Sequence, residues 1–198
     1  MQTLNLDLTK RYSYADYLGW FDDIRRELHD GFIKLMSPAP NFYHQDISGN
    51  LSFELMKFLK NKKCKVIAAP FDVRFPKKNS KGNKTIFTVV QPDISVICDL
   101  SKLDKRGCLG APDMIVEIVS PSNVERDIEE KFKIYEENGV REYWIAFPET
   151  KMLHVFLLDK DEKYKLVGMY SKNKKVKVNI FEDLFIDLSE IFTYELED

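Results

Sequence analysis

Two segments of the chain decide the fold: VVQPDISVIC at residues 89–98 and MIVEIV at residues 114–119. Both are rich in the apolar and β-branched residues that form strands buried on both faces of a sheet. Each also holds one carboxylate, Asp93 in the first segment and Glu117 in the second. A lone carboxylate in a buried strand is costly unless it is paired, protonated or bound to a metal ion. The two acids are therefore the first candidates for a functional site.

Taken alone, each acid also has a structural explanation. Glu117 could pair with a buried lysine or arginine or lie on a solvated edge, and Asp93 could cap a turn beside Pro92. Taken together they are more specific, because the connection between the strands has a length that suits a hairpin and allows them to lie side by side. Two carboxylates on one face of a sheet repel each other unless a divalent cation lies between them. The pair therefore predicts a magnesium site, provided that both side chains share a face.

A third acid, Asp113, competes for a place in this site. It lies four residues before Glu117, and that spacing spans about 13 Å along a strand. The two carboxylates are then too far apart to hold one ion. We interpret Asp113 as a strand-entry residue.

The rest of the chain predicts a mixed sheet flanked by helices, an α/β fold in a single domain over residues 1–198. Helices are expected at residues 13–28, with Ser13 as N-cap, at 41–60, and at 123–138, ending at Gly139. A short helix is also expected in the tail at 184–192. Turns or loops are expected at residues 37–40, 77–84 and 120–122. Strands are expected at residues 32–36, 65–75, 85–98, 114–119, 142–147, 152–158, 163–170 and 176–179.

The composition is that of an ordinary globular protein: 198 residues, 44% apolar and 31% charged. Because the net charge is −2, any basic surface for nucleic acid must be local. Lysine runs at 57–65, 77–84 and 172–177 could supply it, although the default for each is solvated surface. No apolar stretch approaches the roughly 18 residues that span a membrane, so no membrane-spanning segment is expected.

Three cysteines, Cys64, Cys98 and Cys108, are scattered through the chain. Their odd number and the absence of a CxxC pair favour reduced thiols over a disulfide framework. This pattern predicts a cytoplasmic protein.

The helix after the second acidic strand supplies a basic residue, Lys131. It has an ordinary alternative as a solvated partner of Asp127, four residues earlier. If the helix packs on the sheet, Lys131 instead points at the acids, where it could stabilise a phosphate or help to deprotonate water. Lys133 is the alternative basic residue if a different face of this helix packs on the sheet.

The segments VVQPDISVICD, GAPDMIVEIVSPS and RDIEEKFKIYEENGVREYWIAFPE together resemble the Uma-type restriction endonucleases of bacteria. The resemblance extends from residues 26–40 to 181–192. It implies the PD-(D/E)XK restriction-endonuclease-like fold and phosphodiester cleavage with one or two Mg²⁺ (or Mn²⁺) ions. It makes Asp93 and Glu117 the two acids and metal ligands. Val119 stands where the pattern has lysine, so the resemblance assigns that role to Lys131.

The resemblance implies further site residues. Gln91 would line the site, and the first core helix would add an acid, Glu54, with Glu27 as the weaker candidate. His44 matches a position where the family carries histidine, and its alternative is a core or cap histidine. The implied function is a Mg²⁺-dependent DNA endonuclease that acts as a homodimer. The alternative is a catalytically weak or inactive nucleic-acid-binding or regulatory module of the same fold.

Overall fold

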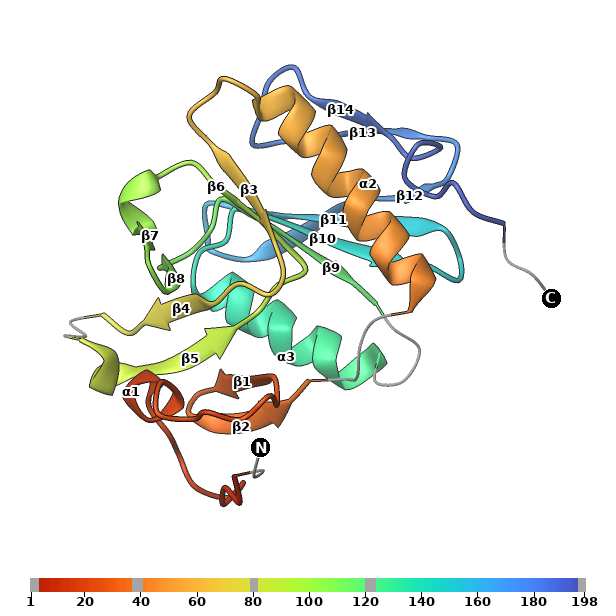
Figure 1. Ribbon diagram of the computed structural model, residues 1–198. Helices are drawn as coiled ribbons and strands as arrows, with labels where there is room; N and C mark the ends of the chain where they lie inside the picture. Colours follow the sequence, from red (N-terminus) through yellow and green to blue (C-terminus); the bar gives the residue numbers. More distant parts are fainter. Residues whose placement is uncertain (1–3, 37–40, 79–81, 120–123, 196–198) are drawn as a thin grey trace.

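In a computed structural model, the described residues form two six-stranded mixed sheets, a two-stranded sheet and two long helices (Figure 1). The structure describes residues 4–36, 41–78, 82–119 and 124–195, and at 124–127 it describes the backbone alone. The expected turns at 37–40 and 120–122 lie outside the described residues, as do the side chain of Asp127 and residues 79–81 of the expected loop.

The first sheet has six strands in the order β12-β11-β10-β9-β6-β3. They are β3 (Lys65–Ala68), β6 (Ile94–Ile97), β9 (Met114–Ile118), β10 (Glu142–Phe147), β11 (Met152–Leu158) and β12 (Tyr164–Ser171). β9 and β10 are parallel, and all other neighbours are antiparallel. Ile94 of β6 lies opposite Val116 of β9. The next residue on each side, Asp93 and Glu117, is thereby brought to the same end of the strand pair.

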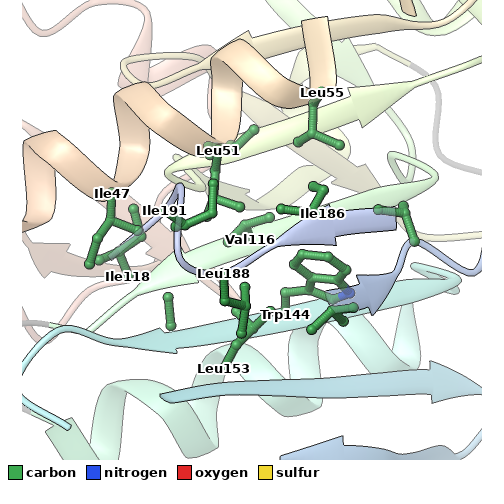
Figure 2. Packing of buried hydrophobic residues seen from close by; sticks show 14 of the residues in the cluster. Ile47, Leu51, Leu55, Val116, Ile118, Trp144, Leu153, Ile186, Leu188 and Ile191 are labelled. Carbon is green, nitrogen blue, oxygen red and sulfur yellow. The ribbon is translucent and has the colours of Figure 1, made fainter. Parts of the chain in front are cut away.

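Helices cover both faces of this sheet, as the sequence predicts. Figure 2 shows Ile47, Leu51 and Leu55 of α2 (Phe42–Leu59) against the face that carries Val116 and Trp144. The small hairpin of β13 (Lys175–Lys177) and β14 (Phe185–Asp187) packs into the same cluster. On the opposite face, α3 (Val124–Glu137) packs through Tyr135. Burial of each such side chain stabilises the fold by about 1.5–3 kcal/mol, so α2 and α3 are firmly docked.

The second sheet has the order β2-β1-β5-β4-β8-β7. Its strands are β1 (Arg26–His29), β2 (Phe32–Leu35), β4 (Val73–Pro76), β5 (Ile86–Val90), β7 (Leu103–Asp104) and β8 (Gly107–Leu109). Two 3₁₀ turns, η1 (Asn83–Thr85) and η2 (Leu100–Lys102), lie beside them. The expected strand at residues 85–98 is therefore two strands, β5 and β6, in different sheets. The break falls at residues 91–93, which places Asp93 where the two sheets meet.

The predicted helix at residues 13–28 is wrong beyond its first turn. Ser13 caps a helix as expected, but α1 spans only Tyr14–Tyr17, and residues 26–29 form β1. β1 and β2 make a hairpin whose two turn residues, Asp30 and Gly31, have φ values of 48° and 89°. Positive φ at both positions is the type I′ turn that Asp-Gly favours. This turn commits residues 26–29 to a strand, despite their helix-like apolar spacing.

Two further predicted elements differ from the structure. The strand expected at residues 65–75 is divided into β3 and β4, in different sheets, with Pro70 in the connection between them. The tail at 184–192 forms β14 and turns rather than a helix, because Ile186 pairs with Val176 of β13. In both cases the partner strand, which is remote in sequence, decides the conformation.

The expectation that no disulfide forms is also wrong. Cys64 and Cys98 are disulfide-bonded, with their Cα atoms 4.0 Å apart. The cause is the register of the β3–β6 pair, which places Lys65 opposite Ile97 and so brings the flanking cysteines together. Cys108 is a buried free thiol. No helix in the described part of the chain is both long and apolar enough to cross a lipid bilayer.

One buried carboxylate, Glu142, fixes the β13–β14 hairpin to the main sheet. It accepts hydrogen bonds from Trp144 Nε1 (2.7 Å) and from the backbone N–H groups of Asn179 (3.0 Å) and Ile180 (2.8 Å). We expect Glu142→Ala to lower the free energy of unfolding by about 2 kcal/mol, because buried donors lose their acceptor. Urea unfolding measures this. The exposed Glu149→Ala is the control, and equal losses in both variants would contradict the prediction.

Candidate active site

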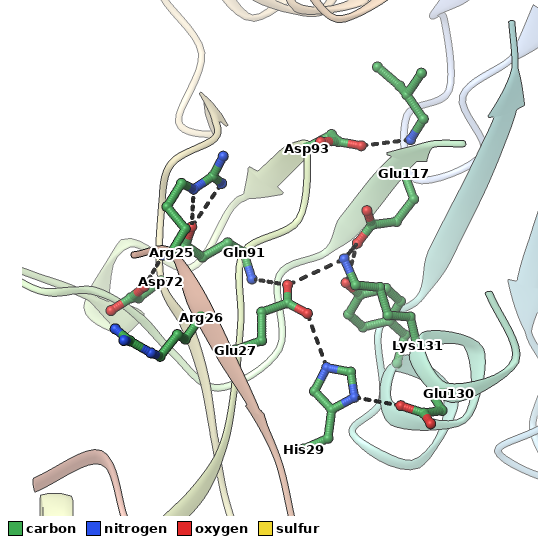
Figure 3. A network of polar contacts seen from close by, with 12 residues as sticks. Arg25, Arg26, Glu27, His29, Asp72, Gln91, Asp93, Glu117, Glu130 and Lys131 are labelled. Atoms are coloured by element: carbon green, nitrogen blue, oxygen red, sulfur yellow. Dashed lines mark hydrogen bonds and ion pairs between the residues drawn. The ribbon is translucent and has the colours of Figure 1, made fainter. Parts of the chain in front are cut away.

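Asp93 lies at the junction of the two sheets, directly before β6. Its Oδ2 accepts a hydrogen bond from the N–H of Ile118 at 2.7 Å (Figure 3). The same oxygen lies 3.2 Å from Nε2 of His44. Its Oδ1 accepts no hydrogen bond from any residue that the structure describes. Because Ile118 follows Glu117 on β9, the hydrogen bond fixes Asp93 beside the second acid.

Glu117 projects from β9 toward α3. Its Oε1 accepts hydrogen bonds from Lys131 Nζ (3.0 Å) and from the hydroxyl of Tyr135 (2.5 Å). Lys131 and Tyr135 are one helical turn apart, so both lie on the face of α3 that packs on the sheet. Oε2 has no hydrogen-bond partner within the described chain. Each of the two acids therefore presents one free carboxylate oxygen.

A third carboxylate, Glu27, reaches the same lysine from the other sheet. Its Oε1 lies 3.3 Å from Lys131 Nζ and accepts the backbone N–H of Gln91 at 2.8 Å. Its Oε2 lies 3.0 Å from Nε2 of His29, whose Nδ1 lies 3.1 Å from Glu130. Lys131 thus bridges one acid from each sheet (Figure 3).

Burial and mutual charge set the protonation of this group. Burial, together with the negative charges of Asp93 and Glu27, raises the pKa of Glu117 to about 7, although Lys131 opposes the shift. Burial alone would lower the pKa of Lys131, but the surrounding carboxylates raise it far above its ordinary value. Burial also opposes ionisation of Glu27, yet Lys131 and His29 lower the pKa of that carboxyl to about 2. Lys131 and Glu27 are therefore permanently charged at neutral pH, and Glu117 is the group that titrates.

His44 lies in the first turn of α2, where Asn41 caps the helix by accepting the His44 N–H at 3.0 Å. Burial disfavours its charged form, but the hydrogen bond and the charge of Asp93 raise the pKa of His44 above its ordinary value. Its Nδ1 is buried and has no hydrogen-bond partner among the described residues. The ring is thus held against Asp93 by one nitrogen only.

The other predicted residues divide into two sets. Gln91 contacts the group through its backbone N–H, which donates to Glu27 (2.8 Å), whereas its side-chain oxygen accepts from Arg25 (2.8 Å) and its amide donates to Asp72 (2.9 Å). Glu54 does not, because it pairs with Lys57 (3.2 Å) on α2 ten residues beyond His44.

Asp113 lies away from the site, as the sequence suggests. It accepts from the N–H of Cys98 (2.6 Å) and pairs with Arg141, just before the start of β9. Its role there is structural.

Glu27, rather than Glu54, is the additional acid that the structure brings to the group. From the sequence alone, Glu27 is the weaker candidate because it falls just before the turn at Gly31. The Asp30-Gly31 turn was the signal that could have identified it. In a hairpin strand that ends at this turn, Glu27 and His29 share one face.

Among the described residues, no group of three or more His, Cys, Asp or Glu side chains is arranged to hold a metal ion. The two free oxygens, Asp93 Oδ1 and Glu117 Oε2, are nevertheless the hard donors that Mg²⁺ accepts. Magnesium commonly uses one or two carboxylates and completes its shell with water and substrate phosphate. The donor set therefore fits a divalent ion without a third protein ligand.

Comparisons with known proteins agree with this architecture. The family model Uma2, described as "Putative restriction endonuclease", matches residues 14–189. Among solved structures, the chain is similar to a crystal structure described as a putative nuclease belonging to DUF820 from Anabaena variabilis ATCC 29413. The TM-score is 0.68 at 16% identity, over 92% of this chain and 98% of that chain, and this likeness shows the fold alone. Among curated proteins no match was found.

Proposed function

The chain belongs to the Uma2 family of restriction-endonuclease-like proteins, and from this premise we propose that it is a Mg²⁺-dependent DNA endonuclease. Asp93 and Glu117 are the metal ligands, and Lys131 is the cation that faces the substrate. The observation that carries the proposal is the pair of free carboxylate oxygens beside a half-buried, permanently charged lysine.

Each residue of the site has a separate role in the proposed hydrolysis of the phosphodiester. When bound, Mg²⁺ (or Mn²⁺) supplies Lewis-acid polarisation of the phosphate and activation of water. Lys131 keeps its proton and stabilises negative charge that develops on the phosphate, so it does not act as a general base. Glu27 holds Lys131 in place from the other sheet. His44 orients Asp93 through its Nε2 contact, which leaves Oδ1 free.

A cleavage assay tests this proposal. The purified chain is incubated with supercoiled plasmid, with linear DNA and with RNA, in Mg²⁺, in Mn²⁺ or in EDTA. We expect nicking of DNA that depends on the metal ion and that EDTA abolishes. Intact DNA at high enzyme concentration in both metals would contradict the proposal.

Metal binding should depend on pH because a proton and the ion compete for Glu117. Its pKa is raised to about 7, so the carboxylate is protonated below that pH and free above it. We expect the affinity for Mn²⁺, measured by calorimetry, to fall about tenfold for each pH unit below that value and to level off above it. An affinity that stays constant between about pH 5 and about pH 7, below the pKa of Glu117, would contradict the assignment of Glu117 as a metal ligand.

A second candidate function is a nucleic-acid-binding or regulatory module with weak or no catalysis. It is favoured by Val119, which replaces the lysine of the family pattern, and by the net charge of −2. DNA binding without metal binding or cleavage would support it. The expected homodimer stays a prediction, which light scattering on the purified chain would check.

A further inference from the structure

A groove of about 990 Å³ lies beside His29 and Glu130, two neighbours of the acidic site. It runs along α3 between the β1–β2 hairpin and the end of β4. His29 and Glu130 line it, and they also belong to the hydrogen-bond chain that starts at Lys131 and Glu27. This hydrogen-bond chain links the groove to the candidate active site, although Asp93, Glu117 and Lys131 do not themselves line the groove.

The walls of the groove are basic, in contrast to the whole chain. They carry four lysines against three carboxylates, Asp30, Glu130 and Glu137. Lys34 pairs with Glu130 (2.8 Å) and Lys77 pairs with Asp30 (3.0 Å). The other two, Lys78 and Lys133, are exposed and form no ion pair with the described residues. These two charges remain available to an anionic ligand.

The groove also presents an apolar surface beside the charges. Phe32 of β2 is 40% exposed and lines it, together with Phe75, Pro76 and Ile134. A lysine-lined groove with an exposed aromatic ring suits single-stranded nucleic acid, because phosphates meet cations and bases stack on the ring. The volume is at the upper end of pockets that enclose one small ligand, about 300–1,000 Å³. It therefore suits a few nucleotides of one strand.

We propose that this groove binds an unpaired strand of nucleic acid that leads into the active site. The inference rests on the proposed function and narrows its substrate class to single-stranded DNA or duplexes with unpaired ends. Lys78 and Lys133 contact phosphates, and Phe32 stacks on a base.

Fluorescence anisotropy in EDTA tests the groove without cleavage. The probes are a labelled oligonucleotide of about 12 nucleotides, the blunt duplex of the same sequence and the duplex with a single-stranded extension. We expect the single strand and the extended duplex to bind more tightly than the blunt duplex. Lys133→Glu and Phe32→Ala should each weaken single-strand binding about tenfold. Lys133→Glu should also make the binding constant less dependent on salt concentration, by the amount expected for the loss of about one phosphate contact.

Two matched variants serve as controls. Lys105→Glu reverses an exposed, unpaired lysine on the β7–β8 turn, and Phe185→Ala removes an exposed phenylalanine of β14. Both should bind like wild type. Equal affinity for blunt duplex and single strand, wild-type binding by the groove variants, or no binding at all would overturn the proposal.

The two proposals fail in different ways. If the groove variants lose binding but plasmid stays intact in Mg²⁺ and Mn²⁺, the proposal that the groove binds a single strand is supported and the nuclease proposal fails. If DNA is cleaved and the groove variants bind and cleave like wild type, the nuclease proposal is supported and the proposal that the groove binds a single strand fails.

Discussion

Glu117→Gln is expected to reduce metal-dependent DNA cleavage at least about a thousandfold, or roughly 4 kcal/mol in activation free energy. The amide removes the negative charge that would hold a divalent ion. It keeps the size of the side chain, and its oxygen can still accept from Lys131 and Tyr135 at the place of Oε1. The fold should therefore survive while the reaction is lost. Initial rates of plasmid nicking, with circular dichroism as a folding check, measure both quantities.

Glu54→Gln is the matched control for this variant. It makes the same chemical change on α2, at a side chain that pairs with Lys57 rather than with the site. We expect wild-type cleavage. Equal loss in the Glu54 and Glu117 variants, or undiminished cleavage by Glu117→Gln, would contradict the assigned ligands.

Lys131→Met is expected to destabilise the protein by about 3 kcal/mol and to reduce cleavage about a hundredfold or more. The lysine is the cation between Glu27 and Glu117, which come from different sheets. Its removal leaves two buried carboxylates without their shared counter-charge, although methionine fills most of the space. Denaturant unfolding at neutral pH and nicking assays at low temperature separate the two effects.

Lys133→Met provides the control for stability. This lysine is two residues further along α3 and is exposed. The free energy of unfolding of the Lys133→Met variant should therefore stay within about 0.5 kcal/mol of the wild-type value. If Lys131→Met unfolds at the same denaturant concentration as Lys133→Met, the bridge between the sheets does not stabilise the fold.

The placement of Asp93 beside Glu117 could be predicted from sequence because the signals are local. Glu117 interrupts an apolar strand, and Pro92 marks the irregularity that releases Asp93 from the sheet. β6 and β9 do pair antiparallel as expected, although the connection between them carries β7 and β8 of the second sheet. The mixed sheet with flanking helices followed from the order of the elements.

Features that depend on remote pairing could not be predicted in the same way. Glu27 enters the site only because β1 pairs with β5, and Cys64 meets Cys98 only because β3 pairs with β6 in one register. The apolar spacing of residues 13–28 fits a helix, and only the Asp30-Gly31 turn opposes that interpretation. Only when residues 26–29 form a strand does Glu27 lie beside Lys131.

The position of a bound ion tests the central claim most directly. Crystals grown with Mn²⁺ and measured near its absorption edge would show the ion in an anomalous difference map. We expect a peak in contact with Asp93 Oδ1 and Glu117 Oε2, and its loss in Glu117→Gln. A peak at other residues, or no peak at a Mn²⁺ concentration that supports cleavage, would contradict the assignment of these two carboxylates as the metal site.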